Sequence, residues 1–462
     1  MTQVTEINEL CYRPDSADLF RHLTDLPWPV FLDSARPYCD QGRYDILSAD
    51  PYVTLSTHGM ETRIDGDGPS RSSGADPLEL LQGYLDEVPQ EPCELPFAGG
   101  ALGYLGYDLG RRFETLPVLA EAEVSLPDMA VGLYDWCVLV DHRQQRSWLL
   151  HQPHGRRPDY DLAAIHTRLQ LKDDAAPRDP FRVVSDIRHN MQRQDYARAF
   201  ARIQRYILEG DCYQVNLTQR FSADVQGDPW LAYARLRQLN PAPFAAYMQT
   251  PEGAVLSSSP ERFLRLTGDA VETRPIKGTR PRSADPDEDR EQALALQNSL
   301  KDRAENVMIV DLLRNDLGRT CRTGTVRVPE LFTLESFATV HHLVSTVTGL
   351  LDEQASATDL LRASFPGGSI TGAPKLRAME IIEELEPQWR SIYCGAIGYI
   401  GFNGNMDTNI AIRTLAMAAG RMHCWAGGGI VRDSTEPDEY QESLDKAAAM
   451  LALYREFSDA GP

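Results

Sequence analysis

The sequence contains no long hydrophobic run and has a deficit of positive charge. No segment provides the roughly 18 uncharged apolar residues that a membrane helix needs, and the stretch before Leu10 has no apolar core like that of a signal peptide. These absences predict a cytoplasmic protein with no membrane partner. The chain has 46 basic and 67 acidic residues, a formal net charge of -21, so a nucleic acid partner is not expected either. Any anionic ligand must then be held by local cations.

Paired cysteines and several common catalytic motifs are also missing. The eight cysteines are dispersed, with no C-x-x-C pair and no histidine at zinc-ligand spacing, so disulfides and structural zinc are not expected. The sequence has no G-x-S-x-G elbow, H-E-x-x-H pair or dinucleotide-binding G-x-G-x-x-G. The glycine-rich segment 366–375 lacks the ending of an ATP-binding Walker A loop. What remains is cation-assisted chemistry on a small anion.

The residues that are present are typical of a globular α+β protein. Hydrophobic residues make up 42% of the chain and charged residues 24%. Short apolar runs broken by turns, such as 98–106 and 129–139, predict a β-rich lobe over residues 1–151. The segment after it is polar and charged, which predicts a connection to a second domain over 185–458.

The second half alternates helices and strands without a fixed repeat. Its predicted elements are helices over 194–209, 292–317 and 437–457 and a strand over 213–221. Gly210 and Gly318 are placed to end the first two helices. The mixture favours an extended antiparallel sheet over a regular βαβ array.

One lysine stands out in this acidic sequence. Lys277 lies between Ile276 and Gly278, directly after Pro275, and proline and glycine together indicate a rigid turn. An amine fixed in this way can act as a nucleophile if its surroundings keep it deprotonated. The alternative is an ordinary solvated lysine, because most lysines are surface charges.

Carboxylates on two predicted helices are candidate metal ligands. Glu305 shares a helix face with apolar residues such as Ile309, so its charge must be paired with a partner or bound to a cation. Glu439, Glu442 and Lys446 share one face of the last helix. That face is either a solvated surface with an ion pair between Glu442 and Lys446, or two acids for Mg²⁺ beside a lysine for an anionic ligand.

Three consecutive glycines follow a probable strand just before the last helix. Gly427, Gly428 and Gly429 would let backbone N–H groups come close to a ligand oxygen. A simple tight turn is the alternative interpretation.

Six ordered motifs, read together, resemble the chorismate-utilising enzymes. They are S-P-E-R at 259–262, P-I-K-G-T at 275–279, the run 301–316, H-H-L-V-S-T at 341–346, the glycine-rich segment 366–375 and the glycines at 427–429. The resemblance implies an α+β fold of two large antiparallel β-sheets packed face to face with helices outside, like that of anthranilate synthase component I.

The resemblance also implies roles for acids and cations. Mg²⁺ would be held by Glu305 and Glu442, with Glu439 close by, and would bridge to the ring carboxylate of chorismate. Tyr399 and Arg413 would hold the pyruvyl carboxylate, where a guanidinium suits bidentate pairing. The implied ligands of the ring carboxylate and of the rest of the substrate are Gly427, Gly428, Gly429, Lys446, Gln214 and Thr279.

Two positions indicate which reaction the resemblance implies. Relatives that add water to chorismate carry a lysine base where this chain has Gln214, and a neutral amide cannot deprotonate water. Lys277 stands where anthranilate synthases have alanine. The implied reaction is amination at C4: Lys277 attacks C2 of the ring, Glu261 protonates the departing hydroxyl, and ammonia displaces the lysine. His342 would assist near the ring.

Two alternatives remain open. An anthranilate synthase would place ammonia at C2 and eliminate pyruvate without needing Lys277. A binding protein that holds chorismate or tryptophan without turnover is a second alternative, although the set of Glu261, Lys277, Glu305 and Glu442 disfavours it.

The resemblance extends to two further ligands. The chain has no cysteine in a G-x-C-x-G turn that would mark a fused glutaminase, so ammonia is expected from a separate glutamine amidotransferase subunit. Leu32, Ser34 and Tyr44, with Pro241 and Phe244, resemble the segments that line a tryptophan pocket in this family. Ordinary core and turn residues are the alternative.

Overall fold

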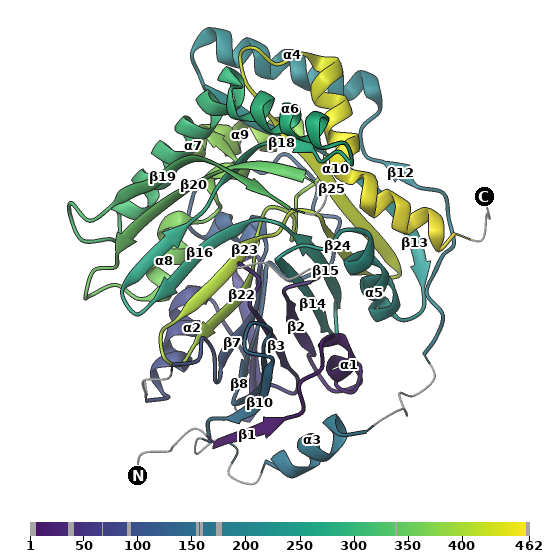
Figure 1. Cartoon of the computed structure of the whole chain (residues 1–462), viewed down its shortest axis with the longest axis vertical. Helices are drawn as coiled ribbons and strands as arrows, with labels where there is room; N and C mark the ends of the chain where they lie inside the picture. The colour runs from purple at the N-terminus through teal and green to yellow at the C-terminus, as the bar shows by residue number, and fades with distance from the viewer. Residues whose placement is uncertain are drawn as a thin grey trace.

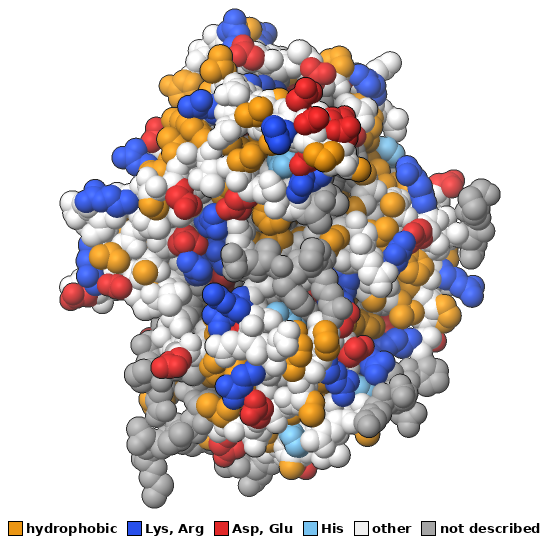
Figure 2. Space-filling model, in the orientation of Figure 1, with side chains coloured by type: hydrophobic (Ala, Val, Ile, Leu, Met, Phe, Trp, Pro, Cys, Tyr) orange, Lys and Arg blue, Asp and Glu red, His pale blue; other side chains and the backbone are white. Residues whose placement is uncertain are grey.

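The computed structural model describes residues 6–35, 41–66, 68–89, 94–153, 157, 160–171, 178–337 and 340–458. Within these residues the strands form two antiparallel sheets, one of 13 strands and one of 12, with helices outside them (Figure 1). This is the α+β architecture that the sequence predicted. No helix of the described part combines the length and the apolar character needed to cross a membrane. Figure 2 shows acidic and basic side chains interspersed over one face of the molecule.

The first sheet contains the strand that carries the three consecutive glycines at 427–429. In spatial order its strands are β1 (Glu6–Leu10), β10 (Arg146–His151), β9 (Trp136–Asp141), β3 (Tyr44–Ser48), β2 (Val30–Asp33), β14 (Phe244–Thr250), β15 (Gly253–Ser259), β24 (Thr414–Ala418), β25 (Arg421–Ile430), β13 (Gln214–Gln226) and β11 (Arg182–Val183). Two short strands also pair with β13, namely β12 (Arg188–His189) and β21 (Gly372–Ala373).

The second sheet contains the strand that carries Lys277. Its order is β18 (Ile276–Pro281), β20 (Val340–Leu350), β17 (Ala270–Thr273), β16 (Arg262–Thr267), β23 (Met406–Ile410), β22 (Ala396–Gly401), β7 (Gly100–Leu105), β8 (Met129–Tyr134), β4 (Val53–His58), β5 (Glu61–Gly66) and β6 (Gly68–Ser73), with β19 (Arg327–Ser336) also paired to β20.

Both halves of the chain contribute to both sheets. The first sheet is joined across the halves by β2 and β14, and the second by β7 and β22. The largest hydrophobic core likewise combines Leu55 and Leu133 with Leu264 and Ile397. The predicted ranges 1–151 and 185–458 therefore build the sheets jointly. Much of the connection between them, including 154–156, 158–159 and 172–177, lies outside the described residues, as do Cys39 and Cys93.

The helices cover the sheets from outside. They are α1 (Ala17–Phe20), α2 (Pro77–Asp86), α3 (Leu162–Leu169), α4 (Arg193–Glu209), α5 (Pro229–Leu239), α6 (Pro286–Gln297), α7 (Leu300–Gly318), α8 (Ala357–Ser364), α9 (Lys375–Leu385) and α10 (Glu436–Glu456), with short 3₁₀ turns η1 (Tyr107–Arg112) and η2 (Gly368–Ile370). Helix α4 ends at Gly210 with φ of 85°, the left-handed cap that the sequence predicted.

Two predicted elements are each divided in the structure. The single helix expected over 292–317 is wrong: α6 ends at Gln297, and Ser299 begins α7 by accepting a hydrogen bond from the backbone N–H of Asp302. The apolar run 129–139 is two strands, β8 and β9, which lie in different sheets on either side of Asp135. A continuous apolar pattern does not reveal where a chain crosses between sheets.

Candidate active site

A cavity of about 680 Å³ gathers most of the predicted site residues. Strand β18, helix α7 and helix α10 border it together with the end of β25. The predicted residues that line it are Glu261, Lys277, Thr279, Glu305, His342, Arg413, Gly427, Gly429, Glu439, Glu442 and Lys446. The structure thus brings predicted residues into one cavity from segments up to 185 positions apart, the span from Glu261 to Lys446.

Lys277 lies on a bulged strand and not on the turn that the sequence predicted. The pairing of β18 with β20 changes register between Ile276 and Thr279, and Gly278 inside this bulge has φ of 80°. A β-bulge redirects side chains locally. The Lys277 side chain is 12% exposed, and its Nζ donates to the backbone oxygen of Ser369 at 2.8 Å. The nucleophile candidate thus faces the cavity and not bulk water.

Glu261 lies close to the same serine. The Ser369 hydroxyl donates to Glu261 Oε1 at 2.7 Å, and the glutamate is only 5% exposed. Burial raises the pKa of the Glu261 carboxyl above its usual range, although Lys277 and the Ser369 hydrogen bond act in the opposite direction. A carboxyl with a raised pKa is suited to hold a proton and deliver it to a leaving group.

The three glycines lie inside strand β25, so the alternative interpretation as a simple tight turn is wrong. They pair with Asn216, Leu217 and Thr218 of β13. A Cβ built on Gly428 would lie 2.9 Å from Glu439 Oε2 and 3.4 Å from Glu442 Oε1, and one on Gly429 would lie 2.9 Å from Glu305 Oε1. At Gly428 and Gly429 the missing side chains therefore leave a bare strip of backbone that all three acids approach closely.

Each of these acids is paired with a lysine. Glu305 lies 3.3 Å from Lys277, and Glu442 lies 2.6 Å from Lys446. Glu439, which is 2% exposed, lies 3.3 Å from Lys301, a lysine for which the sequence predicts no role. Lys301 is the first residue of the third motif, the run 301–316, and nothing in its spacing distinguishes it from a solvated lysine.

The three acids differ in their electrostatics. Burial raises the pKa of Glu439. Burial also raises the pKa of Glu442, but Lys446, Lys301 and Lys277 together lower it more, so the net pKa lies below the usual range. Gln214 lies outside the cavity lining and donates to Glu305 Oε1 at 2.7 Å. Among the described residues, no group of three His, Cys, Asp or Glu side chains is arranged closely enough to hold a metal ion alone.

The opposite side of the cavity carries an arginine and a different tyrosine from the one predicted. Arg413 is largely buried, burial lowers its pKa, and its Nη1 donates to Asn240 Oδ1 at 3.3 Å. Tyr399 does not line this cavity; it lies on β22 and packs against Phe97. Tyr393, just before β22, lines the cavity instead. The expectation that Tyr399 shares a ligand with Arg413 is therefore wrong.

His342 is buried beside Thr279 at the edge of the cavity. Its Nδ1 lies 2.9 Å from Thr279 Oγ1, and the two residues are cross-strand partners of β20 and β18. Burial and the charge of Arg413 lower the pKa of His342 to about 3. The imidazole is therefore neutral at physiological pH and can donate or accept a hydrogen bond but carries no charge.

A second cavity, of about 580 Å³, contains part of the predicted tryptophan pocket. Leu32, Tyr44 and Phe244 line it, together with Tyr399. Ser34 and Pro241 are not among its lining residues. Three of the five residues expected in a tryptophan pocket thus line one cavity, and Tyr399 lines it with them.

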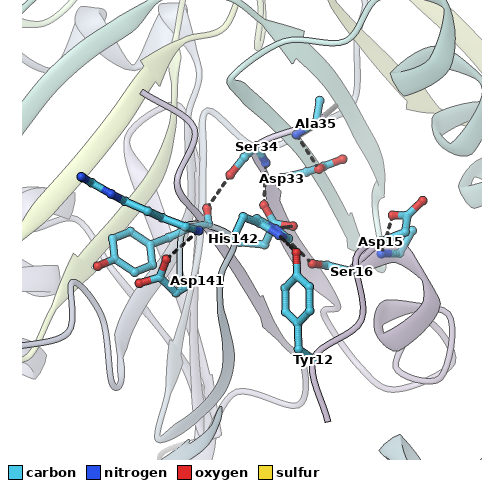
Figure 3. A network of polar contacts seen from close by, with 12 residues as sticks. Tyr12, Asp15, Ser16, Asp33, Ser34, Ala35, Asp141 and His142 are labelled. Atoms are coloured by element: carbon cyan, nitrogen blue, oxygen red, sulfur yellow. Dashed lines mark hydrogen bonds and ion pairs between the residues drawn. The ribbon is translucent and has the colours of Figure 1, made fainter. Parts of the chain in front are cut away.

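Ser34 belongs to a buried polar network that Figure 3 shows. Its hydroxyl donates to the backbone oxygen of Tyr44 at 2.8 Å, and its backbone N–H donates to Asp45 Oδ1 at 2.7 Å. The other carboxyl oxygen of Asp45 lies 2.7 Å from Nε2 of His142, and both side chains are almost fully buried. Ser34 thus holds strands β2 and β3 together and does not face the cavity.

Comparisons with known proteins point to one family. Residues 37–452 match the family of chorismate binding enzymes. The chain is 51% identical over 446 residues to aminodeoxychorismate synthase component 1 of Escherichia coli (strain K12), covering 96% of this chain and 97% of that protein. It is 40% identical to anthranilate synthase component 1 of Streptomyces coelicolor, covering 84% of this chain and 79% of that protein.

A solved structure shows the same architecture. The crystal structure of anthranilate synthase component I from Streptococcus pneumoniae superimposes with a TM-score of 0.78 at 32% identity, covering 88% of this chain and 92% of that one.

Proposed function

The chain belongs to the chorismate-binding enzyme family, and we propose that it aminates chorismate at C4 to give 4-amino-4-deoxychorismate, for p-aminobenzoate and folate biosynthesis. The observation that carries this proposal is an amine and an acid held by one residue in one cavity: Lys277 and Glu261 both bond to Ser369. Three relatives that are 51%, 51% and 52% identical over almost the whole chain have the name of that synthase, which supports the same reaction.

The cations of the cavity suit a substrate with two carboxylates. Arg413 has no ion-pair partner among the described residues, and a carboxylate would satisfy its buried guanidinium. We assign to it the pyruvyl carboxylate of chorismate, with Tyr393 at the same wall. The ring carboxylate would lie near the backbone of Gly427 and Gly429 and the ammonium of Lys446, which already bonds to the Gly427 oxygen at 3.1 Å.

Mg²⁺ fits the acidic side of the cavity, and we propose that Glu305 and Glu442 hold it with Glu439 close by. Magnesium takes oxygen ligands and commonly uses one or two carboxylates together with water and substrate. At the strip of backbone formed by Gly428 and Gly429, the missing side chains let the carboxylates of all three acids come close to the backbone. When bound, the ion would neutralise the ring carboxylate beside these acids.

The chemistry is proposed as two successive displacements. The Lys277 amine forms a bond to C2 while the two ring double bonds shift and the C4 hydroxyl leaves, protonated by Glu261 to water. Ammonia then bonds to C4, the double bonds shift back, and the C2–nitrogen bond to Lys277 breaks. Covalent catalysis of this kind replaces one difficult step with two easier ones. Neutral His342 would act through hydrogen bonding alone.

The ammonia is proposed to come from a separate glutamine amidotransferase subunit. The designation "component 1" of the relatives supports a partner of this kind. The test is size exclusion of this chain with the matching glutaminase, combined with a glutamine-dependent assay. Absence of both association and glutamine-supported turnover would contradict this part of the proposal.

The product of the reaction tests the main proposal. Purified protein is incubated with chorismate, Mg²⁺ and ammonium at mildly alkaline pH, and the product is identified by mass. We expect 4-amino-4-deoxychorismate from the wild type and a loss of at least about 100-fold in turnover for Lys277→Ala, because the nucleophile is gone. Anthranilate as the product would instead establish the second candidate function, which the 40% identical anthranilate synthase component 1 keeps open.

The second cavity is proposed to bind tryptophan. Its aromatic and apolar lining, from Leu32, Tyr44, Phe244 and Tyr399, suits an indole ring. Thermal unfolding with and without tryptophan tests this, with tyrosine as the control ligand. An unchanged unfolding temperature at millimolar tryptophan would count against the proposal, unless mass spectrometry of the denatured protein finds the amino acid already bound.

A further inference from the structure

One residue, Ser369, contacts both side chains that the proposed chemistry requires. It lies in the 3₁₀ turn η2 between helices α8 and α9 and is 6% exposed. Its backbone oxygen accepts from Lys277 Nζ at 2.8 Å, and its hydroxyl donates to Glu261 Oε1 at 2.7 Å. In the sequence, segment 366–375 excludes ATP binding and adds to the family resemblance, but it predicts no role for Ser369 itself. The two bonds place the amine and the acid in one cavity, but they do not yet assign separate tasks to the hydroxyl and to the carbonyl of Ser369.

We propose that Ser369 is a positioning residue that fixes the nucleophilic amine and the acidic carboxyl relative to each other for the amination of chorismate. This inference rests on the proposed function. It assigns separate tasks to the hydroxyl and to the backbone carbonyl, which can be separated by substitution.

The hydroxyl determines which oxygen of Glu261 carries the proton. A protonated carboxyl has one O–H group, and an oxygen that accepts a hydrogen bond from Ser369 acts as the carbonyl oxygen. The proton then resides on Oε2. The backbone N–H of Ile276 also bonds to this carboxyl, so the group is held from two sides. An acid with a fixed proton position transfers it along one direction only.

The backbone carbonyl holds the amine without adding a charge. Lys277 has a second partner, Glu305, at the longer distance of 3.3 Å. If Glu305 is engaged with a cation, the Ser369 oxygen remains as the group that orients Nζ. A neutral carbonyl accepts one N–H and leaves the rest of the amine free to react.

The loop that carries Ser369 is anchored from outside the cavity. Lys375 Nζ donates to Asp316 Oδ2 and to the backbone oxygen of Ser364, both at 2.8 Å. Arg390, which is 1% exposed, donates from Nη1 to the backbone oxygen of Ile370 at 3.0 Å. Both anchors are buried or largely buried charges. They fix the turn in place independently of substrate, which is what a positioning residue requires.

Ser369→Ala removes the hydroxyl and keeps the carbonyl, so it isolates the effect on Glu261. With wild type confirmed to make the C4-aminated product, we expect kcat to fall by about 10- to 100-fold for this variant while KM for chorismate changes by less than about twofold. The alkaline limb of the kcat–pH profile is expected to move to higher pH, because a donor that stabilised the carboxylate is lost. The charged groups near Glu261, Lys277 on β18 and Lys446 on α10, are unchanged in the variant.

Thr371→Val is the matched control. The Thr371 hydroxyl donates to the backbone oxygen of Gly367 at 3.1 Å, so its loss perturbs the same loop without touching Glu261 or Lys277. We expect no displacement of the alkaline limb in this variant. Ser369→Cys, of similar volume and a weaker donor, is expected to shift the limb in the same direction as alanine, and it serves if the alanine variant fails to fold.

The outcomes separate the inference from the function on which it rests. If wild type forms no C4-aminated product, the proposed function fails and the inference with it. If wild type does form it and Ser369→Ala keeps the wild-type kcat and alkaline limb, the inference alone is wrong. An equal displacement of the limb in Thr371→Val would also overturn it, because the effect would then come from the loop and not from the hydroxyl.

Discussion

The three glycines of β25 have different neighbours, so the same substitution is expected to have a different effect at each. A Cβ on Gly427 would lie 2.1 Å from the backbone oxygen of Leu217 and 2.8 Å from its carbonyl carbon. Strands β13 and β25 would have to move apart, because neither atom is part of a flexible side chain. We expect Gly427→Ala to lower the free energy of unfolding by about 3 kcal/mol or more.

At the next glycine, Gly428, an added Cβ would contact only the ends of side chains. A Cβ on Gly428 would lie 2.9 Å from Glu439 Oε2 and 3.4 Å from Glu442 Oε1. Both carboxylates can rotate away, so we expect Gly428→Ala to change the free energy of unfolding by less than about 1 kcal/mol. Its effect falls on cation binding, which we expect to weaken by about 10-fold or more because the acids are displaced and the strip is filled.

Gly429→Ala is expected to lie between these two. Its Cβ would come within 1.9 Å of Gln214 Nε2, so that side chain must move and give up its 2.7 Å hydrogen bond to Glu305. A lost hydrogen bond to a buried charged group costs about 1–3 kcal/mol. We expect that loss of stability together with weaker cation binding.

Two measurements on each variant test this series. Urea unfolding gives the free energy of unfolding, and titration with Mn²⁺ followed by electron paramagnetic resonance gives the affinity for a divalent cation. Equal destabilisation of all three variants would refute the assignment of neighbours. Wild-type Mn²⁺ affinity in Gly428→Ala would refute the placement of the cation at this strip.

Three further expectations follow from the charges of the site. Lys301→Met removes the ammonium that competes with a metal ion for Glu439. Because this lysine is partly exposed, the variant should bind Mn²⁺ only about two- to fivefold more tightly than wild type. Weaker binding would contradict the pairing of Lys301 with Glu439. Arg413→Met removes a buried cation without an ion-pair partner among the described residues, so calorimetry should show loss of chorismate binding while unfolding occurs at the same or a higher temperature. Burial raises the pKa of Glu261 above 4.5, so the stability that its protonated form contributes is present below pH 4.5 and is lost as the pH rises. Urea unfolding between about pH 5 and 8 should therefore show a smaller fall in the free energy of unfolding with pH for Glu261→Gln than for wild type. An equal fall in both proteins would contradict the raised pKa.

The sequence was sufficient for the residues whose chemistry is unusual in their context. Lys277 lies between a proline and a glycine in an acidic chain, and Glu305 lies on an apolar helix face; both line the cavity. The architecture was also predictable, but only through the resemblance. Composition and periodicity alone indicated an α+β protein with extended sheet, without the two layers.

The errors have physical causes that a sequence does not display. Tyr393 and Tyr399 are six positions apart around the start of β22, and which of them faces the cavity depends on where the strand begins. The partner of Glu439 is Lys301 on another helix, 138 positions away, and long-range pairing leaves no local signal. A tight turn at 427–429 was a reasonable alternative because glycine weakens isolated strands. In β25, however, the missing side chains of Gly428 and Gly429 make room for acids from α7 and α10.

The composite sheets have a consequence for how the chain could be divided. Neither half can complete a sheet alone, because separating them would strip β2 from β14 and β7 from β22 and leave four unpaired strand edges. A cut between α3 and β11 should therefore yield two fragments that aggregate when expressed singly. Produced together they should reassemble by pairing those edges, and restored amination by the mixture would make this protein a reporter for split-fragment complementation.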